Sequence, residues 1–223
     1  TAMMRRGVIM MCVVLLWGGA AQAADSPTLA PYADYVRGAA GVQLLDTVRE
    51  ALCVAAGRCD TLRTVAPDWP GAPRPMFVTL ARGRATRACL GRDGSQGSLT
   101  ATVRAIAADL LVADRRHPPV AADELAELRV LVAFVGDERP LADPYAIDPM
   151  REGLRIETER GAVAFLPGEA RTVAWALGEA RRIGVLGAMS EARFTRFAAV
   201  VVSGPAAIPA DPIAPSSHSE VHP

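Results

Sequence analysis

MFVTL (residues 76–80), followed after Arg82-Gly83 by ATRACLG (residues 85–91), is the stretch that indicates how this chain folds. The first segment is rich in aromatic and β-branched residues, which favour strands. The second segment alternates, so that Arg87, Cys89 and Gly91 share one face while Ala88 and Leu90 share the other. Two such segments around a glycine turn predict a β-hairpin over residues 76–91.

A glycine-rich loop and a helix follow this hairpin directly. Glycines recur at three-residue spacing, at Gly91, Gly94 and Gly97, and Ser98 is a good N-cap residue. The helix is predicted to reach about residue 113, because apolar residues recur at helical spacing. Its apolar face consists of Leu99, Val103, Ile106 and Leu110.

Further elements flank this unit on both sides. Apolar stripes with a period near 3.6 residues predict helices, and runs of β-branched residues predict strands. The run before Gly136 is almost continuously apolar, which is typical of a central strand covered on both faces. The predicted helices cover residues 42–56 and 169–183, and the predicted strands cover residues 128–135, 154–158, 162–166 and 193–202.

The two ends of the chain differ in character from its middle. Arg5 and Arg6, an uncharged apolar stretch at 7–17 and a small-x-small site ending at Ala23 have the order of a secretory signal. The apolar stretch is shorter than the roughly 20 residues that a membrane-spanning helix needs. We therefore expect cleavage after Ala23, no permanent membrane span, and export to the periplasm or the outside. The expected division is a signal at 1–23, a lead-in at 24–40, a folded domain at 41–204 and a disordered tail at 205–223.

Composition argues against several classes of function. The chain has 24 basic and 24 acidic residues and a formal net charge of zero, whereas a nucleic-acid-binding protein needs a basic face. All basic residues are arginines, so the lysine of a Walker phosphate loop is missing. His117 is the only histidine in the part expected to fold, too few for a histidine-rich zinc site. No metal site and no nucleic-acid partner are predicted.

Three cysteines remain after the predicted signal, namely Cys53, Cys59 and Cys89. Outside the cytoplasm their thiols meet oxidising conditions. The helix over 42–56 ends at Gly57, where a left-handed cap reverses the chain and returns Cys59 toward the turn that holds Cys53. A Cys53–Cys59 disulfide is therefore predicted, the alternative being two buried thiols, and Cys89 would stay free.

Four segments, read in order, resemble the AMMECR family: MFVTL (76–80), RACLG (87–91), EGLRI (152–156) and GAVAFLP (161–167). The likeness runs from about Val42 to Leu186. It implies an α+β fold with a mainly antiparallel sheet flanked by helices, a larger and a smaller lobe, and a groove lined by the 87–91 signature. It implies no reaction, because the biochemical role of the family is largely unassigned. The sequence departs from the family's usual Leu, Gly and His at Thr86, Ala88 and Glu152.

The strongest candidate site combines the 85–91 strand with the glycine loop. Free amides at the positive end of a helix attract an anion, and arginine can clamp it. The same positive surroundings favour the thiolate form of a nearby cysteine. Structural roles stay open as the alternative, because buried cysteines and turn glycines are common. The predicted ligand-binding residues are Arg87, Gly91, Arg92, Gly94, Gly97 and Ser98, and the candidate catalytic residue is Cys89.

Three functions stay open at this point. The first is an exported domain that binds a small anionic ligand, a carboxylate or a phosphate, at Arg87 and the glycine loop. The second is a cysteine-dependent enzyme with Cys89 as its nucleophile. The third is an envelope interaction module that uses an apolar surface around Phe165 and Trp175. The residues identify no cofactor and no protein partner.

Overall fold

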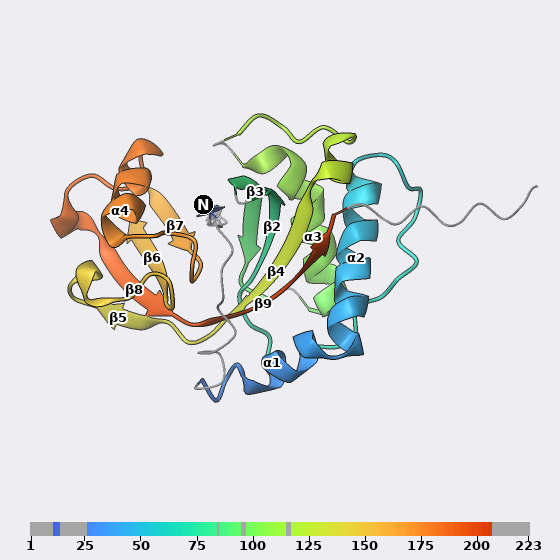
Figure 1. The fold of residues 1–223 in the computed structure, drawn as a ribbon, viewed down its shortest axis with the longest axis horizontal. Helices are drawn as coiled ribbons and strands as arrows, with labels where there is room; N and C mark the ends of the chain where they lie inside the picture. The colour runs from blue at the N-terminus through green and yellow to red at the C-terminus, as the bar shows by residue number, and fades with distance from the viewer. Residues whose placement is uncertain (1–10, 14–25, 84, 95–96, 115–116, 207–223) are drawn as a thin grey trace, which may run out of the picture.

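Two β-sheets, each covered on one face by helices, divide the chain into a larger and a smaller lobe (Figure 1). The computed structural model describes residues 11–13, 26–83, 85–94, 97–114 and 117–206. Most of the predicted signal and the tail beyond residue 206 lie outside the described residues. The expected α+β class with mainly antiparallel pairing is confirmed.

The larger lobe holds a four-stranded antiparallel sheet with helices on one side. Its elements are α1 (Ala30–Arg37), α2 (Ala39–Ala55), β2 (Met76–Arg82), β3 (Ala85–Arg92), α3 (Leu99–Ala113), the short helix η3 (Glu124–Glu127), β4 (Arg129–Val135) and β9 (Ala199–Pro205). The strand order is β3-β2-β4-β9. Helices α2 and α3 cover one face of this sheet (Figure 1).

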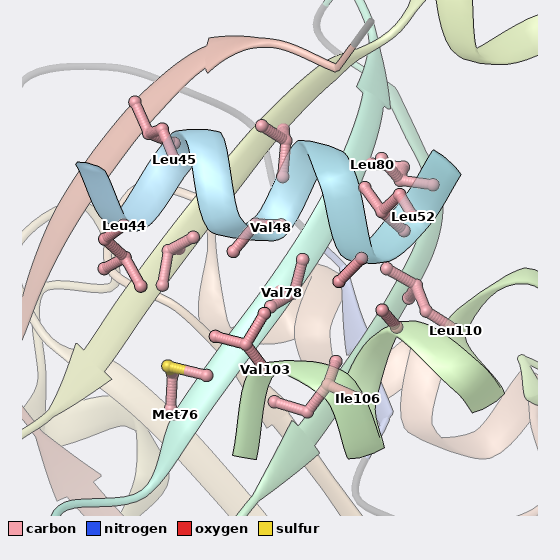
Figure 2. Close-up of a cluster of buried hydrophobic side chains, with 14 of the residues drawn as sticks. Leu44, Leu45, Val48, Leu52, Met76, Val78, Leu80, Val103, Ile106 and Leu110 are labelled. Atoms are coloured by element: carbon pink, nitrogen blue, oxygen red, sulfur yellow. The ribbon is translucent and has the colours of Figure 1, made fainter. Parts of the chain in front are cut away.

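Strand and helix periodicity together build the core of the larger lobe. Every second residue of β2, namely Met76, Val78 and Leu80, faces the helices, where these side chains meet apolar residues such as Val48 and Ile106 (Figure 2). Burying one such aliphatic side chain stabilises the fold by about 1.5–3 kcal/mol. This burial determines which face of the sheet the helices cover.

The smaller lobe is inserted between β4 and β9, and the N-terminal strand joins it. Its elements are β1 (Met11–Val13), β5 (Arg139–Leu141), the short helix η4 (Pro144–Ala146), β6 (Gly153–Thr158), β7 (Gly161–Phe165), α4 (Val173–Arg182), the short helix η5 (Met189–Glu191) and β8 (Arg193–Phe197). The strand order is β1-β7-β6-β8-β5, and α4 packs on one face. All pairs are antiparallel except β1 with β7.

The two lobes meet through an apolar cluster and two connecting segments. The first segment follows β4, the second joins β8 to β9, and the amide of Gly136 in the first donates a hydrogen bond to the carbonyl of Ala198 in the second (2.8 Å). The apolar cluster between the lobes includes Phe77, Cys89 and Leu131 from the larger lobe and Ala164 and Phe197 from the smaller.

The lead-in contains a helix that the sequence does not predict. No helix is predicted for the lead-in at residues 24–40, but it includes α1. Pro31 lies in the first turn of α1, where a missing N–H group costs no hydrogen bond. At the other end, Pro205 belongs to β9 and Ala206 is buried.

Two predicted elements have different limits in the structure. The single strand expected over 193–202 is two strands, β8 and β9, which belong to different sheets and are separated by Ala198. The helix expected from residue 169 begins at Val173, after the Thr172 hydroxyl caps it by accepting a hydrogen bond from the Trp175 amide (3.1 Å). Among the helices of the described residues, none is both long and apolar enough to cross a bilayer.

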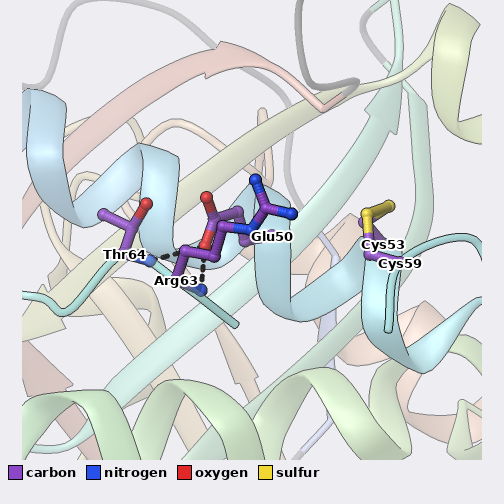
Figure 3. The surroundings of a disulfide bond; sticks show 5 residues. All are labelled: Glu50, Cys53, Cys59, Arg63 and Thr64. Carbon is purple, nitrogen blue, oxygen red and sulfur yellow. Dashed lines mark hydrogen bonds between the residues drawn. A yellow bond between two sulfur atoms is a disulfide. The ribbon is translucent and has the colours of Figure 1, made fainter. Parts of the chain in front are cut away.

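The end of α2 carries the predicted Cys53–Cys59 disulfide (Figure 3). Gly57 has a φ of 68°, and the amides of Gly57 and Arg58 donate to the carbonyls of Val54 and Cys53. This is the Schellman arrangement, in which the chain turns back over the last helical turn. The reversal brings the Cα atoms of the two cysteines to 5.3 Å, within the range that a disulfide spans.

Candidate functional site

A β-bulge in the first hairpin determines the direction of Arg87. Leu80 pairs with Ala88 and Ala81 pairs with Thr86, so Arg87 is an extra residue without a partner on β2. A bulge bends its strand and redirects the extra side chain. The alternation of the sequence contains no sign of this bulge.

Arg87 is bound by the segment that leads into η3 and by Glu124, the first residue of η3. Its guanidinium donates to both carboxylate oxygens of Glu124 (2.9 and 2.8 Å) and to the carbonyls of Pro118 (2.8 Å) and Pro119 (2.9 Å). Only 14% of the side chain is exposed. The hydrogen bond from Arg87, followed by one from the amide of Ala121, lowers the pKa of Glu124 to about 2. Arg87 thus has little donor capacity left for a ligand.

Arg92 points away from Arg87. Its guanidinium pairs with Asp109 of α3, on the helix-covered side of the sheet, whereas Arg87 is bound to the segment around Glu124. The structure therefore does not bring the two predicted arginines together. Arg92 stands opposite Met76, which faces the helices, whereas Arg87 is the extra residue of the bulge.

Cys89 lies in the apolar cluster between the lobes and has no exposed surface. Its amide donates to a carboxylate oxygen of Asp114 (3.0 Å), and its sulfur accepts a hydrogen bond from the Thr79 hydroxyl (3.0 Å). Reactive cysteines are at least partly exposed, whereas a thiol in this setting packs as a small apolar residue.

Packing accounts for two of the predicted loop glycines. A Cβ atom at Gly91 would lie 2.4 Å from the ring of Phe77, its cross-strand partner. Gly94 has a φ of 77°, and a Cβ atom there would lie 2.3 Å from the carbonyl oxygen of Arg74. Both positions need glycine because neighbouring atoms approach the backbone closely.

The other two loop residues have partners inside the protein. Ser98 caps α3, because its hydroxyl accepts a hydrogen bond from the amide of Ala101 (3.2 Å). The carbonyl of Gly97 accepts one from the indole of Trp69 (2.9 Å). The predicted strand, loop and capped helix are therefore present, and the side chains of Arg87, Arg92 and Ser98 have partners inside the protein.

Of the two residues around which an apolar surface was predicted, Phe165 and Trp175, only Trp175 is exposed. Phe165 is buried in the core of the smaller lobe, and Trp175 packs edge-on against it at 6.0 Å between ring centroids and is 41% exposed. Across the described parts of the chain, no three His, Cys, Asp or Glu side chains are grouped so that they could hold a metal ion.

A pocket of about 260 Å³ opens where the two connecting segments run between the lobes. Ser26, which precedes α1, contributes to its wall, and Phe197 and Ala198 form an apolar part. We call this the junction pocket. Its charged lining consists of Asp137, Arg139, Arg151, Glu152 and Arg196.

Two arginines of the junction pocket stand directly opposite each other, Arg139 on β5 and Arg196 on β8. Opposite residues of an antiparallel pair point to the same face with Cβ atoms about 4.5–5.5 Å apart, and like charges there are destabilising. Arg139 is exposed, and within the described residues its guanidinium has no hydrogen-bond or ion-pair partner. Arg196 reaches a single oxygen of Glu152 at 3.3 Å.

The carboxylates of the junction pocket offset the charge of these arginines only in part. Asp137 accepts a hydrogen bond from Arg74, and this bond, with a smaller effect from the charge of Arg139, holds the pKa of Asp137 below its ordinary value. Arg151 interacts loosely with Asp148, at 3.6 Å. Three arginines against two carboxylates leave the lining with a formal charge of +1.

Sequence reasoning missed the junction pocket because its arginines are far apart in the chain. Arg139 and Arg196 meet only through the pairing of β5 with β8, and β5 is a three-residue strand that contains Pro140. A segment of that kind has no strand signal. The junction pocket could have been predicted only if the sequence showed that residues 193–202 pass from one sheet to the other.

Comparisons with known proteins agree with this description. The family model AMMECR1 matches residues 45–199, which is more than half of the chain. The fold is similar to the crystal structure of an uncharacterised protein from Pyrococcus horikoshii, with a TM-score of 0.55 and 22% sequence identity over 74% of this chain and 92% of that one. No curated protein matches the sequence. The chain belongs to the AMMECR1 family.

Proposed function

We propose that this protein binds a small anion, a carboxylate or a phosphate, in the junction pocket. The ligand class is the one expected from the sequence, whereas the site differs, because Arg87 and Arg92 are engaged in ion pairs. The volume of about 260 Å³ suits a small metabolite, and Phe197 and Ala198 offer contact for a short apolar portion of it.

The facing pair of Arg139 and Arg196 is the observation that carries this function. Without a ligand, the two guanidinium groups repel each other on the same face of the sheet. An anion between them would turn the repulsion into two charge-assisted contacts, and arginine presents a planar fork that matches carboxylate and phosphate oxygens. Ligand binding would therefore also join β5 to β8 more firmly.

We further propose that the protein acts outside the cytoplasm after cleavage following Ala23. Two features support export: the order of charged, apolar and small residues in the first 23 positions, and the Cys53–Cys59 disulfide, since disulfides persist in oxidising compartments.

Thermal unfolding in the presence of anions tests the binding function. Phosphate, succinate and acetate would be compared with chloride at equal ionic strength. An anion at about ten times its Kd should stabilise the wild type by about 1.4 kcal/mol, or about 3–5 °C. Arg139→Gln should abolish this response. Without added anion, the variant should be at least as stable as the wild type, because the repulsion between Arg139 and Arg196 is gone.

Arg104→Gln is the matched control, because Arg104 is an exposed arginine on α3, away from the pocket. It should keep the full response to the anion. If no anion stabilises the wild type, or if Arg139→Gln responds as the wild type does, the junction pocket is not an anion site.

A further inference from the structure

Strand β1 differs from every other strand in how it joins its sheet. It pairs in parallel with β7, with Met11 opposite Val163, Cys12 opposite Ala164 and Val13 opposite Phe165. It also lies alongside β3 of the larger lobe. The segment 11–13 therefore runs between the two lobes and adds a strand to the edge of the smaller sheet.

Without β1, the edge of the smaller sheet would be β7. Strand β6 occupies one side of β7, so its other side would present backbone N–H and C=O groups without partners. Residues 162–165 are buried while β1 pairs with β7, so removal of β1 would uncover the backbone groups on this side of the strand. These N–H and C=O groups need hydrogen-bond partners, which another strand paired with β7 would supply.

The surroundings of this edge select an apolar chain. The strands that contact β1 carry three buried, uncharged members of the cluster between the lobes, namely Phe77 on β2, Cys89 on β3 and Ala164 on β7. The segment that occupies the place belongs to a stretch, residues 7–17, that carries no charge. A charged segment would have to bury its charge against these walls at a high cost in free energy.

Residues 11–13, which pair with β7, belong to the signal at 1–23 that the sequence predicts to be cleaved off. We propose that the space between β7 and β3 is a groove for an extended apolar peptide. Residues 11–13 fill it in the unprocessed chain, and after cleavage it accepts an uncharged extended segment of a partner protein, which pairs with β7 in the same parallel register. Addition of a strand to a sheet edge is an established mode of peptide recognition.

The groove does not depend on the junction pocket, whose lining contains no residue of β3 or β7.

Hydrogen exchange read by mass spectrometry tests this groove on the full chain and on the chain that begins at Ala24. The amides of β7 should exchange about tenfold faster or more in the processed chain, because their edge partner is gone. The central strand β4 should exchange equally in both chains and serves as the internal control. A synthetic peptide of residues 9–15, flanked by lysines for solubility, should restore the protection of β7.

The same peptide carrying Cys12→Pro is the matched control, since proline has no N–H group and disrupts strand pairing. It should not restore protection. In the full chain, Cys12→Pro should itself speed exchange in β7, which keeps the test valid if the shortened chain folds poorly.

Equal exchange of β7 in the full and processed chains, or equal protection by both peptides, would overturn the groove. Protection of β7 in the processed chain that rises with protein concentration, together with a dimer in light scattering, would show that a second copy fills the edge and would also overturn it.

Discussion

The contact between Gly91 and Phe77 provides a test at the scale of single residues. Gly91→Ala would place a Cβ atom 2.4 Å from the Phe77 ring in a fully packed region, and such overpacking costs about 1–3 kcal/mol. Gly178→Ala is the control of opposite sign, because no heavy atom lies within 4 Å of its Cβ position in α4. It should stabilise the protein by about 0.5–1 kcal/mol. Denaturant unfolding of both variants measures the difference, and equal effects would contradict this packing.

The pair of Arg87 and Glu124 predicts how stability depends on pH. Because the pKa of Glu124 falls from 4.5 to about 2 on folding, its contribution is fully present above pH 4.5 and is lost as pH falls toward 2. Glu124→Gln should reduce the free energy of unfolding by about 1–2 kcal/mol at neutral pH and should flatten its decline in acid. Unfolding curves recorded across this pH range measure both effects.

Glu127→Gln is the control for that prediction. Glu127 is 71% exposed and meets Arg82 at 3.3 Å, so its loss should change stability by less than about 0.5 kcal/mol. The free energy of unfolding could instead fall in acid as steeply in Glu124→Gln as in the wild type. That result would contradict the prediction that the pair of Glu124 with Arg87 causes the fall.

Residue types on their own could not separate these roles. Arg87 was expected to clamp a ligand because it stands near glycines and a cysteine, but the bulge at this position directs it to Glu124, 37 residues further along the chain. The sequence does predict that Ser98 caps a helix and that Cys89 and Arg87 stand on one strand, since those features depend on near neighbours only.

At the scale of elements, the disulfide and Glu50 both tie the loop after α2 to the helix. Glu50 accepts hydrogen bonds from the amides of Arg63 (2.7 Å) and Thr64 (2.6 Å), as Figure 3 shows. Replacing Cys53 and Cys59 together by serine should reduce the free energy of unfolding by about 2 kcal/mol, because the unfolded chain gains freedom. Reductant should have a similar effect on the wild type and none on the double variant. A double variant that is as sensitive to reductant as the wild type would contradict this assignment.

Elements were predictable where the signal is local. The Schellman cap at Gly57 and the hairpin β6–β7 follow from neighbouring residues, and both are present as expected. The split of residues 193–202 into β8 and β9 is not encoded locally, because the run is continuous and only the insertion of the smaller lobe requires the chain to change sheets at Ala198. The junction pocket depends on that change.

At the scale of the whole molecule, the signal-like order of residues 1–23 and the Cys53–Cys59 disulfide predict a defined processing and redox state. The protein secreted by a bacterial host should have the mass of residues 24–223. Denatured without reductant, it should accept one alkyl group, at Cys89, and after reduction it should accept three. Intact-mass spectrometry checks both statements. Retention of residues 1–23 would contradict export, and three reactive thiols without reduction would contradict the disulfide.

The central claim is that Arg139 and Arg196 together bind an anion at the junction of the lobes. Isothermal titration calorimetry with inorganic phosphate and with succinate tests it most directly, using the wild type, the double variant Arg139→Gln/Arg196→Gln and the control Arg104→Gln. At least one of the two anions should bind the wild type and the control at one site, and the double variant should bind it at least about tenfold more weakly, because two charge-assisted contacts are lost. Equal affinity in all three proteins, or no binding of either anion to the wild type, would contradict the claim.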